Sequence, residues 1–255
     1  MNEITTLIAA AEKVTVTFAK VKQTIPLLDL TSLNSSDTDA SITELCQKAL
    51  RLSEKVAAVC VYPQFVKLIK QQLANSGIKI CTVANFPEGS TDIEATVKTI
   101  FANAVNGADE IDVVMPYSAF LTGETSVVQT FVKVCKQACG PHITLKVILE
   151  TGALVNPEQI YQASCAAIAG GADFIKTSTG KVDINATLPA AAAMLTAIKD
   201  TGGSVGFKAA GGIRTAQQAL GYLYLGEQIM GNDWITPGHF RLGASSLLDD
   251  LLAFK

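Results

Sequence analysis

Charged and aromatic residues are both scarce in this 255-residue chain: charged side chains make up 17% of it and aromatic side chains 6%. Soluble domains ordinarily carry about 25% charged residues, so the shortage indicates that a large share of the chain is buried on folding. The 20 Lys and Arg are balanced by 23 Asp and Glu, which gives a formal net charge of -3. Since no excess of positive charge is available to neutralise phosphates, we expect no nucleic-acid partner.

Long apolar segments are missing as well. The longest uncharged stretch, 184–198, includes Asn185, Thr187 and Pro189 and is shorter than the roughly 18 apolar residues of a spanning helix. Near the N-terminus, acidic Glu3 precedes a short apolar stretch and no basic residue comes before it, so no signal peptide is expected. These features predict a cytoplasmic protein without a membrane partner.

The six cysteines are scattered and include no Cys-x-x-Cys pair: Cys46, Cys60, Cys81, Cys135, Cys139 and Cys165. The two histidines, His142 and His239, lie far apart in sequence, so no spacing typical of metal ligands is present. We therefore expect reduced, mostly buried thiols and no metal site.

Short β-rich segments alternate with longer helical segments through most of the chain. The predicted strands are 24–30, 56–62, 78–84, 110–115, 143–150, 172–178, 204–210 and 240–244. The predicted helices are 41–52, 64–75, 92–106, 125–139, 157–169, 187–200, 215–226 and 246–253. Several open on a capping residue; Asn156, for example, precedes Pro157 at a first helical position.

Most of the predicted strands are apolar on both faces, as expected where helices cover one side and a packed interior fills the other. Eight strand and helix units in about 250 residues predict a parallel (β/α)8 TIM barrel, with residues 1–22 as an additional N-terminal helix. A doubly wound open sheet is the main alternative. No linker or low-complexity segment marks a boundary, so residues 1–255 are expected to form a single domain.

Four consecutive predicted strands carry a charged residue within their apolar sequence: Asp112 in the fourth, Lys146 in the fifth, Lys176 in the sixth and Lys208 in the seventh. TIM barrels place their active sites at the C-terminal ends of the strands. A buried ammonium group loses hydration, and a neighbouring cation favours its neutral, nucleophilic form. Together, Lys176, Lys208 and Asp112 indicate Schiff-base chemistry at a carbonyl, with the carboxylate moving protons. Any one lysine alone could instead reach the surface or form a structural ion pair.

Glycines and hydroxyl residues gather directly after the sixth, seventh and eighth predicted strands. They are Thr179, Gly180 and Lys181, then Gly211, Gly212 and Arg214, then Gly243, Ala244, Ser245 and Ser246. Backbone N–H groups in glycine turns bind anions, and TIM barrels frequently hold phosphate in the loops after strands seven and eight. The pattern predicts a phosphate site. The alternative is that these glycines only make tight turns.

Six motifs occur in the order and at the spacing of one enzyme family: LDLTSLN, GADEIDVVMPY, LKVILETG, ADFIKTSTGK, VGFKAAGGIRT and RLGASSLL. Over about residues 24–248 the chain resembles the deoxyribose-phosphate aldolase family of class I aldolases. The resemblance implies a lyase, without metal or other cofactor, that reversibly cleaves 2-deoxy-D-ribose 5-phosphate to D-glyceraldehyde 3-phosphate and acetaldehyde. The implied partners are small phosphorylated sugars and small aldehydes, and a homo-oligomer, either dimer or tetramer, is compatible with it.

The motifs also imply roles for single residues. Lys176 resembles the Schiff-base lysine of the family, Lys208 the second lysine that perturbs it, and Asp112 the acid/base carboxylate that works with a bound water. Lys146 is expected to pair with Asp112 or to help set its charge.

Further positions match the pocket of the family. Asp29 and Thr31 match polar pocket positions, whereas Cys60 is either a pocket residue or plain packing. The phosphate-binding turns are matched by Gly180, Lys181, Gly211, Gly212, Gly243, Ser245 and Ser246. Arg214 fits the same neighbourhood, with bracing of the loop as the alternative.

Two departures from the family pattern bear on the mechanism. Ala209 stands where the seventh-strand motif often has proline, which is expected to loosen the backbone after Lys208. Some members end in a tyrosine that assists proton transfer, whereas this chain ends with Phe254 and Lys255. We therefore expect protonation to depend on Asp112 and water alone.

Three competing functions use the same residues differently. The first is a transaldolase or another class I phosphosugar aldolase, and the second is a phosphosugar isomerase on the same barrel. The third is a catalytically silent barrel that binds a phosphorylated ligand. An isomerase needs no imine, so trapping with borohydride separates it from an aldolase.

Overall fold

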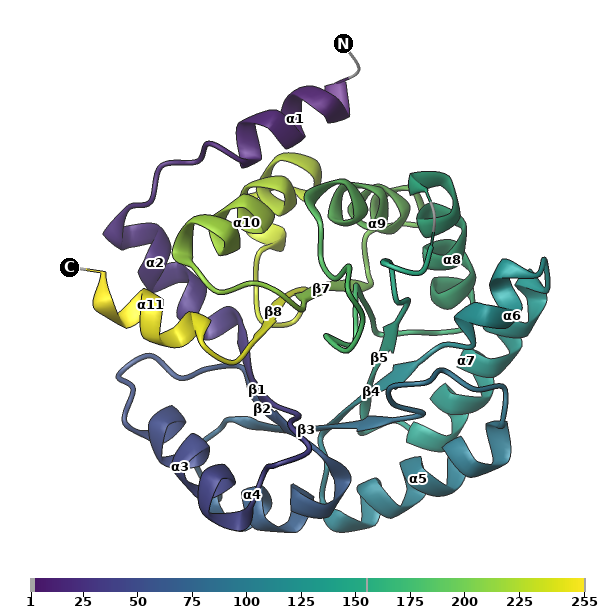
Figure 1. Cartoon of the computed structure of the whole chain (residues 1–255), viewed down its shortest axis with the longest axis horizontal. Helices are drawn as coiled ribbons and strands as arrows, with labels where there is room; N and C mark the ends of the chain where they lie inside the picture. Colours follow the sequence, from purple (N-terminus) through teal and green to yellow (C-terminus); the bar gives the residue numbers. More distant parts are fainter. Residues whose placement is uncertain (1–2, 155, 255) are drawn as a thin grey trace.

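Eight parallel strands close into a barrel in the computed structural model, which describes residues 3–154 and 156–254 (Figure 1). The strands follow one another around the barrel in chain order, and β8 pairs with β1. They are β1 (Leu28–Ser32), β2 (Ala58–Val61), β3 (Lys79–Ala84), β4 (Glu110–Val114), β5 (Thr144–Ile148), β6 (Phe174–Lys176), β7 (Gly206–Ala210) and β8 (Phe240–Ala244). The predicted TIM barrel is confirmed, and the open doubly wound sheet is excluded.

Helices form a ring outside the strands (Figure 1). They are α1 (Glu3–Ala11), α2 (Phe18–Thr24), α3 (Asp39–Leu50), α4 (Val66–Gln72), α5 (Ile93–Asn106), α6 (Tyr117–Leu121), α7 (Thr125–Cys139), α8 (Pro157–Ala169), α9 (Leu188–Asp200), α10 (Ala216–Met230) and α11 (Leu247–Ala253). Side-chain caps explain where several begin: Asn156 accepts from the Gln159 N–H, and Thr215 forms a capping box with Gln218. No helix within the described ranges has the length and apolar character needed to cross a bilayer.

Two expectations near the N-terminus are wrong. Residues 3–24 form two helices instead of the single predicted helix over 1–22, whose first two residues lie outside the described residues. The break follows from the β-branched run 14–17, where Thr17 is extended and caps α2 through the Lys20 N–H. The first strand begins at Leu28 and not at residue 24, because Pro26 starts a short 3-10 helix, η1 (Ile25–Leu27).

The interior of the barrel contains charged side chains. Lys146 and Lys208 are fully buried and rank in size with the buried rings of Phe207 and Phe240. The main apolar core, by contrast, lies between the strands and the surrounding helices, where it draws on the outward faces of the strands. The fold therefore places an ionic layer inside the barrel and surrounds it with apolar packing.

Close packing at the start of β7 gives a test of this architecture. A methyl group at Gly206 would lie 2.3–2.6 Å from the Phe174 ring on the neighbouring strand. We expect Gly206→Ala to lower the free energy of unfolding by about 1–3 kcal/mol through overpacking. Gly238→Ala is the matched control, since the nearest atom to its new methyl would be Thr236 Oγ1 at 3.5 Å. Equal urea midpoints for the two variants would contradict the packing.

Candidate active site

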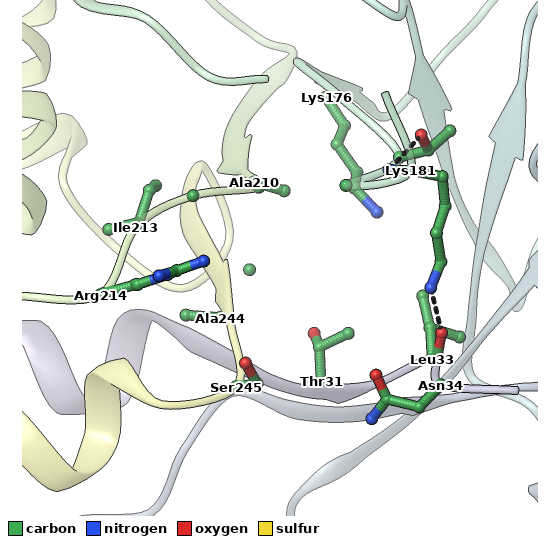
Figure 2. A pocket seen from close by; sticks show the side chains of 15 residues that line it. Thr31, Leu33, Asn34, Lys176, Lys181, Ala210, Ile213, Arg214, Ala244 and Ser245 are labelled. Carbon is green, nitrogen blue, oxygen red and sulfur yellow. Dashed lines mark hydrogen bonds between the residues drawn. The ribbon is translucent and has the colours of Figure 1, made fainter. Parts of the chain in front are cut away.

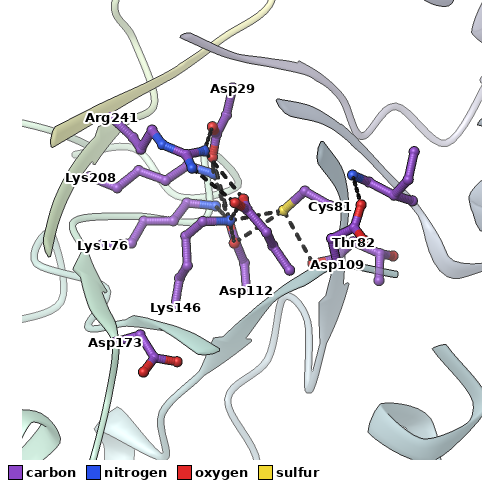
Figure 3. Close-up of polar contacts among 12 residues, drawn as sticks. Asp29, Cys81, Thr82, Asp109, Asp112, Lys146, Asp173, Lys176, Lys208 and Arg241 are labelled. Atoms are coloured by element: carbon purple, nitrogen blue, oxygen red, sulfur yellow. Dashed lines mark hydrogen bonds and ion pairs between the residues drawn. The ribbon is translucent and has the colours of Figure 1, made fainter. Parts of the chain in front are cut away.

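Asp112 is the centre of the ionic layer. Its Oδ1 lies 2.8 Å from Lys146 Nζ, and its Oδ2 lies 2.8 Å from both Lys176 Nζ and Lys208 Nζ (Figure 3). Strand register produces this arrangement, because Asp112 is paired with Lys146 across β4 and β5, and Lys176 with Lys208 across β6 and β7. One carboxylate therefore receives hydrogen bonds from three lysines.

A second group of charges lies deeper in the barrel. Arg241 donates to Asp29 Oδ1 at 2.5 Å and to Glu110 Oε1 at 2.9 Å. The lysines reach the same carboxylates: Lys208 Nζ is 2.5 Å from Asp29 Oδ2, and Lys146 Nζ is 2.7 Å from Glu110 Oε2. All these groups are nearly inaccessible to solvent, so pairing replaces the hydration that burial removes.

We call these seven side chains the ion-pair cluster. Its members are Asp29, Glu110, Asp112, Lys146, Lys176, Lys208 and Arg241. With every group ionised, three carboxylates face four cations. Within these contacts Lys146 and Lys208 each reach more than one carboxylate, whereas Lys176 reaches Asp112.

The pairing fixes the ionisation of most of the cluster. Burial acts to raise the pKa of Asp112, but Lys146, Lys176 and Lys208 outweigh it and hold the pKa well below its usual value. In Asp29, Lys208 and Arg241 likewise outweigh burial and lower the pKa. Burial acts to lower the pKa of Lys146 and of Lys208, yet Asp112 and the other nearby acids raise both pKa values. The two carboxylates therefore carry negative charge, and these two lysines carry positive charge, at neutral pH.

Two sets of buried side chains have the spacing of metal ligands: Cys60, Cys81 and Asp112, and Asp29, Cys81 and Glu110. The Lys146 ammonium lies among them, 3.1 Å from Cys81 Sγ, 2.8 Å from Asp112 Oδ1 and 2.7 Å from Glu110 Oε2. A metal ion bound to the same atoms would be repelled by this ammonium. These side chains instead neutralise the positive charge of Lys146.

A cavity of about 190 Å³ opens at the C-terminal ends of the strands (Figure 2). Its wall includes Thr31, Asn34, Lys176, Thr179, Gly180, Lys181, Gly211, Gly212, Arg214, Gly243 and Ser245. The Lys176 side chain projects into this cavity, while its Nζ remains hydrogen-bonded to Asp112. Lys176 thus belongs both to the cavity wall and to the ion-pair cluster.

Six predicted residues lie outside the cavity wall, and three of them, Asp112, Lys146 and Lys208, belong to the ion-pair cluster. Asp29, the second residue of β1, is buried in the ion-pair cluster beneath the mouth. Cys60 packs in a small apolar cluster that includes Cys81 and Val83. Ser246 is exposed and precedes α11, one residue beyond Ser245, which does line the cavity.

Glycines lie on the cavity wall in the turn after β7 and near the end of β8. Gly211 has φ +89°, and a Cβ there would lie 2.6 Å from Asn185 Oδ1. A Cβ at Gly243 would lie 3.0 Å from Lys208 Cε. Backbone can therefore approach a ligand closely at these turns, and Lys181 and Arg214 add positive charge to the same wall.

Sequence reasoning missed three charged residues near the site. Glu110 stands two residues before Asp112, which places it on the same face of β4, and Arg241 interrupts the apolar strand β8 as the lysines do theirs. The same signal, a charge inside an apolar strand, could have found both. Glu150 follows β5, and its carboxylate contacts Thr179 of the cavity wall.

The arrangement suits covalent chemistry at a carbonyl group. Lys176 provides an amine at the cavity surface, and Asp112 stabilises positive charge at that nitrogen from 2.8 Å. The neighbouring Lys208 cation can donate a proton, and the glycine turns can receive an anionic group.

Comparisons with known proteins agree with this chemistry. The model of the DeoC/LacD family aldolases matches residues 23–250. A candidate deoxyribose-phosphate aldolase from Toxoplasma gondii has a TM-score of 0.85 at 27% identity, over 92% of this chain and 96% of that one. One from Coccidioides immitis has a TM-score of 0.80 at 26% identity, over 99% and 97% of the two chains. Deoxyribose phosphate aldolase from Aeropyrum pernix, described as a tetramer, has a TM-score of 0.75 at 23% identity, over 97% and 96%.

Acid titration tests the ion-pair cluster. Below about pH 4 the carboxyl groups of the unfolded chain bind protons, whereas Asp29 and Asp112, whose pKa values are lowered, stay ionised in the folded state. Stability should therefore be full above pH 4 and fall as the pH decreases, by up to about 1.4 kcal/mol per pH unit for each such carboxylate.

Asp29→Asn removes one of these carboxylates. We expect the plot of unfolding free energy against pH, measured by urea titration, to have a smaller slope in this variant than in the wild type. Parallel plots would show that Asp29 is not held ionised by Lys208 and Arg241.

Proposed function

Because this chain belongs to the DeoC/LacD family of aldolases, we propose that it cleaves 2-deoxy-D-ribose 5-phosphate reversibly to D-glyceraldehyde 3-phosphate and acetaldehyde. The observation that carries the proposal is the position of Lys176. Its Nζ reaches the cavity from a buried cluster that holds one more cation than carboxylates. An amine that lines a cavity and is hydrogen-bonded to a buried carboxylate can serve as the nucleophile of a class I aldolase.

The first step is attack of neutral Lys176 Nζ on C1 of the open-chain sugar, followed by loss of water to give an iminium ion. The iminium withdraws electrons from the C2–C3 bond. When the C3 hydroxyl loses its proton, that bond breaks and its electron pair stays on C2 as an enamine. Glyceraldehyde 3-phosphate leaves, C2 gains a proton, and hydrolysis releases acetaldehyde.

Asp112 and Lys208 serve this sequence in different ways. When Lys176 is neutral, the ion-pair cluster is balanced in charge, and the iminium restores a positive charge opposite Asp112 Oδ2. Lys208 Nζ lies 2.8 Å from the same oxygen, so a proton can pass between Lys208 and the reacting atoms through Asp112 or a water molecule. Lys146 keeps Asp112 oriented from its other oxygen.

The phosphate end of the substrate is assigned to the turns after β6, β7 and β8. These turns comprise Gly180, Lys181, Gly211, Gly212, Arg214, Gly243 and Ser245, with Ser246 next in the chain. Lys181 Nζ donates to the Leu33 carbonyl oxygen across the mouth, so its ammonium is held at the cavity. Thr31 lies on the β1 side of the cavity (Figure 2) and is available for a sugar hydroxyl.

A transaldolase or another class I phosphosugar aldolase is the second candidate, since it would use the same lysine and phosphate turns. The cavity of about 190 Å³ favours a small substrate such as a pentose phosphate. A phosphosugar isomerase is disfavoured because its mechanism makes no use of a buried lysine pair.

We further propose one domain over the whole chain, small phosphorylated sugars and aldehydes as its partners, and a cytoplasmic location without metal or cofactor. A homo-oligomer is favoured by the tetramer described for the Aeropyrum pernix protein. The exposed apolar side chains Phe18, Phe101 and Val105 are available for subunit contacts.

Reductive trapping tests the imine. The protein is mixed with acetaldehyde or 2-deoxyribose 5-phosphate and sodium borohydride, and its mass and peptide map are measured. We expect one adduct, on Lys176, and none in Lys176→Leu, whose aldolase rate should fall by at least about a thousandfold. Lys199→Leu, which removes an exposed lysine of α9, should keep both adduct and activity. No adduct in folded wild-type protein would remove the class I mechanism.

A charge reversal tests the phosphate turns. Ser245→Glu should raise KM for 2-deoxyribose 5-phosphate about tenfold or more, because a carboxylate would face the phosphate, and should change KM for free 2-deoxyribose little. Ser53→Glu adds the same charge in the α3–β2 connection, at the opposite end of the barrel, and serves as the control. Equal changes for both substrates would place the phosphate elsewhere.

A further inference from the structure

Glu150 adopts a backbone conformation that its residue type rarely takes. It lies two residues beyond β5 with φ +54°, in the left-handed region where a residue other than glycine is strained. A strained backbone conformation of this kind persists only where surrounding contacts stabilise it, and it is common at functional sites. Here the Ala153 N–H donates to the Glu150 carbonyl oxygen at 2.8 Å and closes the turn.

The carboxylate of Glu150 is fully buried and is directed at one residue. Its Oε2 accepts from Thr179 Oγ1 at 2.6 Å, and its Oε1 accepts from the Thr179 N–H at 3.3 Å. Burial raises the pKa of Glu150, while these two hydrogen bonds and the charge of Lys176 act against the rise.

Thr179 connects Glu150 to the cavity wall through a second hydrogen bond. Its Oγ1 accepts from the Lys181 N–H at 3.0 Å, across Gly180, which has φ +81°. The residues after Glu150 also pack against the loop that follows β6. The Thr151 N–H donates to the Thr177 carbonyl oxygen at 2.9 Å. The backbone at Gly152 packs so closely that a Cβ there would lie 1.8 Å from the Ile184 carbonyl oxygen. Hydrogen bonds thus run from Glu150 through Thr179 to the turn 179–181.

We infer that Glu150 is a positioning residue that fixes the anion-binding turn 179–181 and thereby sets the preference for phosphorylated over unphosphorylated substrates. This inference deepens the proposed function and rests on its assignment of phosphate to that turn. The carboxylate does not line the cavity and touches no reacting atom. Its effect on substrate passes through the geometry of Thr179 and Lys181.

The test compares Glu150→Ala with Glu150→Gln, which keeps an acceptor oxygen at the same reach. In Glu150→Ala the ratio of kcat/KM for 2-deoxyribose 5-phosphate to that for 2-deoxyribose should fall about tenfold or more, mainly through KM for the phosphorylated sugar. Glu150→Gln should recover much of the ratio. Borohydride trapping of acetaldehyde on Lys176 should persist in both variants.

Asp173→Asn is the matched control. Asp173 also braces β5 against β6, accepting from the Leu145 N–H at 2.7 Å and from Lys136 Nζ at 2.6 Å, but at the end of the strands opposite the cavity. Asp173→Asn should lower the free energy of unfolding without changing the ratio of kcat/KM for 2-deoxyribose 5-phosphate to that for 2-deoxyribose. If Glu150→Ala does not fold, Thr179→Val against Thr179→Ser tests the same contact from its other partner.

Calorimetric titration with inorganic phosphate makes the test independent of catalysis. The affinity for inorganic phosphate should fall about tenfold in Glu150→Ala and should stay at the wild-type value in Asp173→Asn. Equal losses for both sugars with unchanged phosphate affinity would overturn the inference and leave Glu150 a structural residue. Failure of the proposed function looks different: wild-type protein would form no Lys176 adduct, while phosphate affinity would still report on Glu150.

Discussion

Burial of seven ionisable groups inside one barrel is the constraint on which the rest of the structure depends. Each charge would cost several kcal/mol if it lost water without a partner. Asp112 limits that cost by accepting from three lysines, and Arg241 does so by joining Asp29 to Glu110. These contacts join β1, β4, β5, β6, β7 and β8, so the barrel must close with these strands in one register for the charges to meet.

The fold was largely readable in the sequence because both faces of each strand are buried, which produces apolar runs separated by capped helices. The four charged residues of β4 to β7 were identifiable for the same reason, since a charge contrasts with an apolar strand. Of their partners, the pairing of Lys146 with Asp112 was expected from the family resemblance and is present, whereas the others were not identified. Which carboxylate meets which lysine depends on register between strands up to about two hundred residues apart, as with Asp29 and Lys208.

Local conformation limited other predictions. The break before α2 and the late start of β1 depend on Thr17 and Pro26, whose effects on backbone geometry do not change the apolar pattern. Glu150 was overlooked since a glutamate after a strand is ordinary in a sequence; only its left-handed backbone and its burial against Thr179 distinguish it. Ser245 and Ser246 are adjacent in sequence and both exposed, yet the structure places only Ser245 on the cavity wall.

The four cations of the ion-pair cluster differ in the contacts that hold them. Arg241, which remains charged in proteins, binds two carboxylates, and its guanidinium lies 5.5 Å from the centroid of the Phe174 ring. Lys146 and Lys208 come next, fully buried and held charged by acids. Lys176 ends β6 at the cavity, with Asp112 as its carboxylate partner. Lys176 is therefore the cation of the cluster that reaches the cavity, while the other three remain in the packed interior of the barrel.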